Sequence, residues 1–154
     1  MRKYKIEIFN KENIFDGLAH NLMKDIFDLG IKSLKDLKVS YLYLIEGNLN
    51  LSRIKTICEK LLIDPVTQEY KISNSKTKVS DYKNVHIVEV WYKQGVTDAV
   101  GDTTKIGIKD LGIEGDFSVR TGMKYTLVGV NIKEAEKIAD KILANKVVQT
   151  YKII

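Results

Sequence analysis

Two short stretches of this 154-residue chain combine cations, glycines and a carboxylate in a way that could dock another protein. The first, Lys93-Gln94-Gly95-Val96-Thr97-Asp98, has a glycine that allows a sharp turn and an aspartate that can cap the next helix. The second, Val119-Arg120-Thr121-Gly122-Met123-Lys124-Tyr125, places two cations around a glycine. The two stretches could simply form a helix entry and a hairpin, or they could form a partner-docking surface. The candidate docking residues are Lys93, Gly95, Asp98, Gly101, Arg120, Gly122 and Lys124.

Residue types that commonly carry catalysis or bind metals are sparse in this chain. His20 and His86 have no acid or cysteine at the spacing of a metal site or a catalytic triad. No glycine-rich loop matches a phosphate-binding motif. The single cysteine, Cys58, falls on the apolar side of an expected helix and should be a buried structural thiol. We therefore expect no catalytic residue, no cofactor and no metal in the chain itself.

Both stretches lie in the second of two sequence repeats. Residues 6–31 align without a gap on residues 88–113, always 82 positions later, and residues 57–72 align on 138–153 at an offset of 81. The second alignment has eight identities in sixteen positions, where chance would give roughly one. The chain is thus a duplication. We predict repeat 1 at residues 1–75, a polar linker at 76–84 and repeat 2 at 85–154.

Both repeats show the same order of expected elements. Alternating residues predict an opening strand, at 5–9 and 85–92. Asp16 and Asp98 should cap the first helices, which Gly30 and Gly112 should end. A strand-like segment follows, at 37–46 and 117–130, either a bent strand or a tight hairpin with its break at Thr121-Gly122. A second helix, at 51–63 and 132–144, and a closing strand, at 66–72 and 147–153, complete each repeat.

This order is that of α+β ferredoxin-like folds with a split βαβ arrangement, βαββαβ in each repeat. We expect two fused ferredoxin-like repeats that pack as a pseudo-dimer, with helices on the outside of antiparallel sheets. The covalent repeat would then imitate a homodimer. Such folds serve RNA binding, metabolite sensing, metal transport and assembly, so the fold alone does not name a function.

Charge and hydropathy bear on two questions, whether the chain binds nucleic acid and whether it enters a membrane. The net charge is +5 and the pI is about 9.1, but the lysines are scattered among acids, which favours a solvated surface over a nucleic-acid reader. No apolar run reaches the roughly 18 residues that span a bilayer, and the N-terminus leads straight into a strand without a signal region. We expect a cytoplasmic location.

The motifs resemble a known family. They are Val88-Glu89-Val90, Lys93-x-Gly95-Val96-x-Asp98-x-x-Gly101, Asp110-Leu111-Gly112, Val119-Arg120-x-Gly122-x-Lys124, and Leu143-Ala144-Asn145 followed by Val147-Val148. In order and spacing they look like the small PurS subunit of phosphoribosylformylglycinamidine (FGAM) synthase. The paired arrangement, with Ile63-Asp64-Pro65-Val66-Thr67-Gln68 ending the first copy, is more similar still to the N-terminal region of fused, long-chain forms. The resemblance covers essentially the whole chain.

The resemblance implies a role in the fourth step of purine biosynthesis, in which glutamine and ATP convert formylglycinamide ribonucleotide to formylglycinamidine ribonucleotide. It implies a synthetase (PurL-like) partner that holds ATP and magnesium, and a glutaminase (PurQ-like) partner that releases ammonia. The small subunit, as a dimer, would bridge the two and support ammonia transfer without catalytic residues of its own. A homo-oligomer, a complete subunit and the leading region of a longer enzyme are all compatible with this implication.

The two copies differ in the expected docking loop. The family often has proline where this chain has Ala99, and the first copy, residues 10–16, keeps only the lysine and the aspartate of the loop. We hypothesise that the second copy faces the synthetase and that the first completes the pair. Substitution of Gly95 or Arg120 should then weaken the complex more than substitution of Asn13 or Lys38.

Two other functions stay open on the sequence alone. A regulatory module would bind a small effector at the seam between paired sheets. A weak RNA-binding protein would expose aromatic side chains on a sheet face, with Tyr41, Tyr43, Phe117 and Tyr125 as the candidates. Core packing is the expected role of most of these aromatics.

Overall fold

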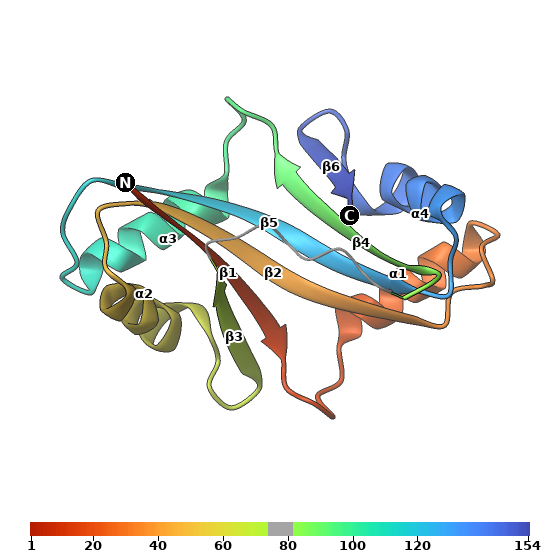
Figure 1. Cartoon of the computed structure of the whole chain (residues 1–154), viewed down its shortest axis with the longest axis horizontal. Helices are drawn as coiled ribbons and strands as arrows, with labels where there is room; N and C mark the ends of the chain where they lie inside the picture. Colours follow the sequence, from red (N-terminus) through yellow and green to blue (C-terminus); the bar gives the residue numbers. More distant parts are fainter. Residues whose placement is uncertain (74–81) are drawn as a thin grey trace. The chain divides into compact units, whose positions relative to one another are not determined.

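The computed structural model describes residues 1–73 and 82–154, and Figure 1 shows the arrangement of its elements. Most of the expected linker, residues 76–84, lies outside the described residues. Across the described part of the chain, every helix is too short or too polar to span a membrane.

The two repeats have the same element order. Repeat 1 consists of β1 (Arg2–Asn10), α1 (Gly17–Asp28), β2 (Asp36–Gly47), α2 (Leu51–Ile57) with the π-helical turn η1 (Cys58–Leu62), and β3 (Gln68–Ser73). Repeat 2 consists of β4 (Val85–Tyr92), α3 (Ala99–Asp110), β5 (Phe117–Val128), α4 (Ile132–Ile138) with the π-helical turn η2 (Ala139–Leu143), and β6 (Gln149–Ile153). The α+β class and the two ferredoxin-like repeats are confirmed. Of the two expectations for the middle segment, the hairpin is wrong, because β2 and β5 are each one strand of 12 residues.

Side-chain caps and glycines fix the first helix of each repeat, as predicted. The Asp16 carboxylate accepts a hydrogen bond from Ala19 N at 3.0 Å, and the Asp98 carboxylate accepts one from Gly101 N at 2.9 Å. Gly30 (φ +100°) and Gly112 (φ +83°) take the left-handed conformation that ends a helix. Local sequence therefore sets both ends of α1 and α3.

The strands pair in antiparallel fashion within each repeat. β1 lies between β2 and β3, with Ile6 opposite Tyr43 and Ile72, and β4 lies between β5 and β6, with Val88 opposite Tyr125 and Ile153. The strand order is β3-β1-β2-β5-β4-β6. The central pair of this order, β2 and β5, contains the two longest strands.

The chain forms two compact units, and their division crosses β2 between Ser40 and Tyr41 and β5 between Thr121 and Gly122. Unit 1 contains β1, the later part of β2, α2, η1 and β3 of repeat 1 together with α3 and the start of β5 from repeat 2. Its core joins residues of both repeats: Tyr4, Ile6, Ile8, Ile45, Leu49, Ile54, Ile57, Cys58, Ile108, Ile113, Phe117 and Val119. In Figure 1, α2 and α3 accordingly lie on the same side of unit 1.

Unit 2 has the reciprocal composition. It contains β4, the later part of β5, α4, η2 and β6 of repeat 2 together with α1 and the start of β2 from repeat 1. Ala19 and Ile26 of α1 are buried with Val88 and Val90 of β4 and with Ile138 of α4. Each unit therefore takes its first helix from the other repeat. The predicted boundaries at 1–75 and 85–154 describe sequence repeats, whereas the units follow the packing of the cores.

Candidate functional site

Asp98 fastens the start of α3 to β5 within unit 1. Besides capping Gly101 N, its Oδ1 accepts a hydrogen bond from Thr121 Oγ1 at 2.7 Å, and its Oδ2 accepts one from Thr121 N at 2.6 Å. Thr121 is 8% exposed, so these bonds lie away from bulk water. A carboxylate with several such donors holds two elements in a fixed relation.

Gly101 is required by the closeness of this contact. A Cβ atom at Gly101 would lie 2.8 Å from the carbonyl oxygen of Val119 and 2.9 Å from the Asp98 carboxylate. The first copy has Ala19 at the matching position, and there Asp16 accepts a hydrogen bond from its backbone N. The structure thus brings two predicted site residues, Asp98 and Gly101, together and gives them a positioning role.

The turn at residues 93–96 follows β4 in unit 2. Lys93 N donates to Val148 O at 2.9 Å, and Val96 N donates to Lys93 O at 3.2 Å. Gly95 has φ +81°, and open space surrounds the position of its missing Cβ. Backbone conformation, not crowding, is therefore the reason for glycine at this position.

The first copy forms the same turn in unit 1, although its sequence differs. Lys11 N donates to Thr67 O at 2.9 Å, Ile14 N donates to Lys11 O at 3.3 Å, and Asn13 has φ +66°. Asparagine is one of the few residues other than glycine that adopts this left-handed conformation readily. The turn is thus kept in both copies, and the difference between them lies in side chains.

Gly122 lies in the middle of β5, in unit 2. A Cβ atom there would be 2.6 Å from Val90 O and 2.7 Å from Cε3 of the Trp91 ring, so the indole covers the glycine. Trp91 Nε1 donates to Glu89 Oε1 at 3.1 Å, and Lys152 Nζ lies 3.8 Å from the same oxygen. Lys124 faces Glu89 in the strand register. Glu89 is fully buried.

Sequence reasoning gave no site role to Trp91, Glu89 or Lys152, although Glu89 is part of the Val88-Glu89-Val90 motif. The signal was present, because Glu89 is a charge between two buried valines of a strand, and a buried carboxylate requires partners. The seven predicted docking residues divide between the units. Asp98, Gly101 and Arg120 belong to unit 1, and Lys93, Gly95, Gly122 and Lys124 belong to unit 2. Their role in docking stays a prediction.

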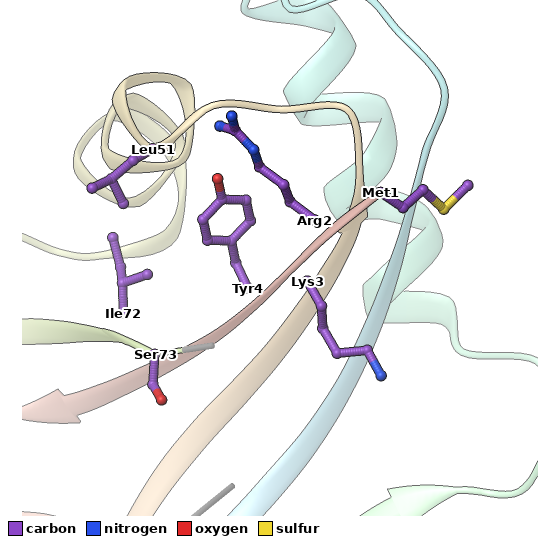
Figure 2. A pocket seen from close by; sticks show the side chains of 7 residues that line it. All are labelled: Met1, Arg2, Lys3, Tyr4, Leu51, Ile72 and Ser73. Atoms are coloured by element: carbon purple, nitrogen blue, oxygen red, sulfur yellow. The ribbon is translucent and has the colours of Figure 1, made fainter. Parts of the chain in front are cut away.

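A pocket of about 660 Å³ opens at the start of β1 in unit 1. Figure 2 shows Leu51 and Ile72 facing Tyr4, with Arg2 extending beside the Tyr4 ring and Lys3 pointing away. The Tyr4 hydroxyl donates to Leu49 O at 3.0 Å, which fixes the ring. Arg2 also lines a neighbouring hollow with Asn48, Asn50 and Arg53. The pocket is therefore apolar on one side and cationic on the other.

Most of the candidate stacking aromatics are core residues. Phe117 and Tyr125 are 4% and 6% exposed, and Tyr43 packs against the core of unit 1. Tyr41, at 44% exposed, is the exception among the four. The expectation of core packing is confirmed for three of these residues, and they offer no aromatic surface to stacked bases.

Cys58 is buried, as expected. Burial, and next the charge of Glu59, raise the pKa of its thiol from 9.0 to about 12. Among residues 1–73 and 82–154, no group of three or more His, Cys, Asp or Glu side chains is placed to hold a metal ion.

A family model described as "PurS: Phosphoribosylformylglycinamidine (FGAM) synthase" matches residues 3–76 and again residues 85–154. A search of curated proteins gave no match. The family match falls on both repeats and covers nearly the whole chain.

Proposed function

The chain belongs to the PurS family of FGAM synthase, with two PurS-like repeats in tandem, and we propose that it bridges the catalytic parts of that enzyme. Membership makes it a component of FGAM synthase in purine biosynthesis. Its partners in the proposal are a synthetase, which would hold ATP and magnesium, and a glutaminase. The chain itself would supply no catalytic group and would support the passage of ammonia between them.

One observation carries the proposal: both repeats match the family, and each compact unit is built from both repeats. A bridging dimer needs two binding surfaces. Fusion of two PurS-like repeats places both copies of such a surface on one chain. Because the repeats are covalently joined, their side chains can diverge to suit different partners.

Reconstitution of FGAM synthase from its separate parts tests the proposed bridging function. The chain, the synthetase and the glutaminase from the same host are mixed, and FGAM formation is measured with glutamine and, separately, with ammonium salt as the nitrogen source. Omission of the chain should abolish glutamine-dependent synthesis and leave ammonia-dependent synthesis intact. Glutamine-dependent synthesis at an unchanged rate without the chain would contradict the proposal.

We further propose that the second copy faces the synthetase through Lys93, Gly95 and Lys124 of unit 2, and that Arg120 of unit 1 makes a separate contact with the synthetase. Because Asn13 and Gly95 share the left-handed conformation, Gly95→Asn and Asn13→Gly change the side chain while keeping the turn. Gly95→Asn or Arg120→Ala should weaken synthetase binding about tenfold more than Asn13→Gly or Lys38→Ala, the range expected for central interface residues. Isothermal titration measures the difference, and equal losses would refute the assignment.

The pocket of Figure 2 supports one alternative, a regulatory site for a small effector with an anionic group. Arg2 would bind the anion, and Tyr4, Leu51 and Ile72 would cover an apolar part. Its volume lies in the usual range for ligand sites, about 300–1,000 Å³. A rise in melting temperature of the chain alone on addition of a nucleotide or an amino acid, lost in Arg2→Ala, would favour this function.

A further inference from the structure

Two arginines of unit 1 line one hollow at the starts of β1 and α2. This hollow of about 370 Å³, which we call the arginine hollow, is bordered by Arg2, Asn48, Leu49, Asn50 and Arg53. Arg2 also lines the larger pocket of Figure 2, so the two cavities adjoin at its side chain. Like charges around one hollow repel each other, and their shared position calls for a physical reason.

Neither arginine forms an ion pair with a carboxylate in the part of the chain that the structure describes. The adjacent cation, Lys3, does form one, with Glu46 at 3.4 Å. Arg53 Nη1 donates to the backbone carbonyl of Glu114 at 3.5 Å, a weak bond that leaves the positive charge unbalanced. Both guanidinium groups are therefore available to an anionic ligand.

The second copy shows that the fold does not require an arginine at position 53. Glu134 stands at the matching place in α4, and its carboxylate accepts from Asn131 N at 3.0 Å to complete a capping box. Arg53 cannot accept such a bond, and α2 keeps the other half of the box, in which Asn50 Oδ1 accepts from Arg53 N at 2.9 Å. Glutamate stabilises a helix better than a cation at this position. Ligand binding explains why the first copy has an arginine there.

The other polar residues of the arginine hollow also distinguish the first copy. Asn84 stands where the first copy has Arg2. The offset between the copies falls from 82 at Gly47 to 81 at Asn50, so the first copy has one residue more in this loop, and the loop exposes Asn48. The arginine hollow is thus specific to unit 1.

The donors of the arginine hollow fit a phosphate monoester. Each guanidinium group carries five N–H donors in a planar fork, so two arginines match an anion with three free oxygens and close to two negative charges. A carboxylate has two oxygens and one charge, which a single arginine can satisfy. The adjoining pocket offers Leu51 and Ile72 to an apolar or planar group on the same ligand (Figure 2).

We propose that unit 1 binds a small phosphate monoester, with its phosphate between Arg2 and Arg53 and its organic part against Leu51 and Ile72. The exposed amide of Asn48 donates to the phosphate from the rim of the hollow. This inference goes beyond the bridging function and does not depend on it. It gives the alternative effector site a ligand class and adds Arg53, which lies outside the pocket of Figure 2.

The test titrates the full chain with adenosine monophosphate (AMP), adenosine and inorganic phosphate by calorimetry at constant ionic strength. AMP carries both a phosphate and a planar group, whereas the other two ligands carry one part each. AMP should therefore bind at least about tenfold more tightly than either part. Undetectable AMP binding, or adenosine or inorganic phosphate binding as tight as that of AMP, would overturn the proposal. An oligoadenylate without terminal phosphates that binds more tightly than AMP would indicate a nucleic-acid surface and would overturn it too.

Arg53→Glu gives the first copy the residue that the second copy has, so this variant should fold with a melting temperature no lower than that of the wild type. It should weaken AMP binding at least about tenfold, because a carboxylate replaces a cation in the hollow. Lys55→Glu is the matched control, because it makes the same change of charge on α2 and Lys55 lines neither cavity. It should bind AMP close to the wild type.

Equal losses of AMP affinity in the Arg53→Glu and Lys55→Glu variants would reduce the effect to overall charge, and the proposed site would be wrong. The bridging function would still stand in that case, because reconstitution with the synthetase and the glutaminase tests it separately. Conversely, AMP binding by the chain alone would stand even if reconstitution showed no need for the chain.

Discussion

Burial governs the chemistry of the single thiol. Cys58 has no exposed surface and lies in the core of unit 1 with Ile54 and Ile57. Loss of water contact raises the cost of the thiolate, and the nearby Glu59 carboxylate raises it further, so the pKa rises to about 12. The protonated thiol is thus the form that packs in this core.

Cys58 should resist alkylation in the folded chain. At pH 8, iodoacetamide labelling followed by mass spectrometry should be orders of magnitude slower in buffer than in denaturant, because both burial and protonation suppress attack. The raised pKa also predicts that this thiol's contribution to stability is complete below about pH 9 and declines as the pH approaches 12. Fast labelling of the native chain at pH 8 would contradict the structure.

Residue types predicted helix caps better than contacts between residues that lie far apart in the sequence. Asp16 and Asp98 were identified as helix caps because a cap needs only its own next three residues. The bonds from Thr121 to Asp98 span 23 residues, and the covering of Gly122 by Trp91 joins two strands. Neither contact has a signature within one short stretch of sequence, so both emerged only from the fold.

At the scale of elements, the Asp98 carboxylate ties the start of α3 to β5 in addition to their shared core. Asp98→Ala should lower the free energy of unfolding by about 2–4 kcal/mol, since a helix cap contributes about 1 kcal/mol and each further hydrogen bond about 1 kcal/mol. Asp16→Ala removes the matching cap of α1 and should cost about 1 kcal/mol. Urea unfolding followed by circular dichroism measures both values. If both substitutions lowered the free energy of unfolding equally, the hydrogen bonds from Thr121 to Asp98 would contribute nothing to stability.

The order of elements was predictable, whereas the sequence left open whether residues 117–130 form one strand or a hairpin. Caps and glycines delimit the first helices, and alternation marks the strands, because both signals are local. Gly122 has the composition of a hairpin break, yet it lies within one continuous strand. The neighbouring Trp91 ring fills the space that a side chain would take. A glycine in a strand can thus mark a close approach as well as a turn.

At the scale of the whole molecule, the sequence repeats and the packed cores divide the chain at different places. The duplication identifies two repeats, because aligned residues share ancestry. The cores identify two units that each join both repeats, with Ile108 of α3 in unit 1 and Ile26 of α1 in unit 2. Helical periodicity shows that a helix has an apolar face, but it does not show which sheet that face will cover.

The exchanged helices predict that the repeats fold only together. Residues 1–75 alone would lack Ile108, Ile113, Phe117 and Val119 from the core of unit 1. Each large apolar side chain contributes roughly 1.5–3 kcal/mol when buried, against a total stability of about 5–15 kcal/mol. At micromolar concentration, residues 1–75 and residues 85–154, expressed separately, should show no cooperative unfolding by circular dichroism. Mixing the two fragments should restore cooperative unfolding.

The control is the full chain cut at a protease site inserted in the linker, which should stay folded because both repeats remain paired. A monomeric single repeat that unfolds cooperatively would show that the helix exchange is dispensable for folding.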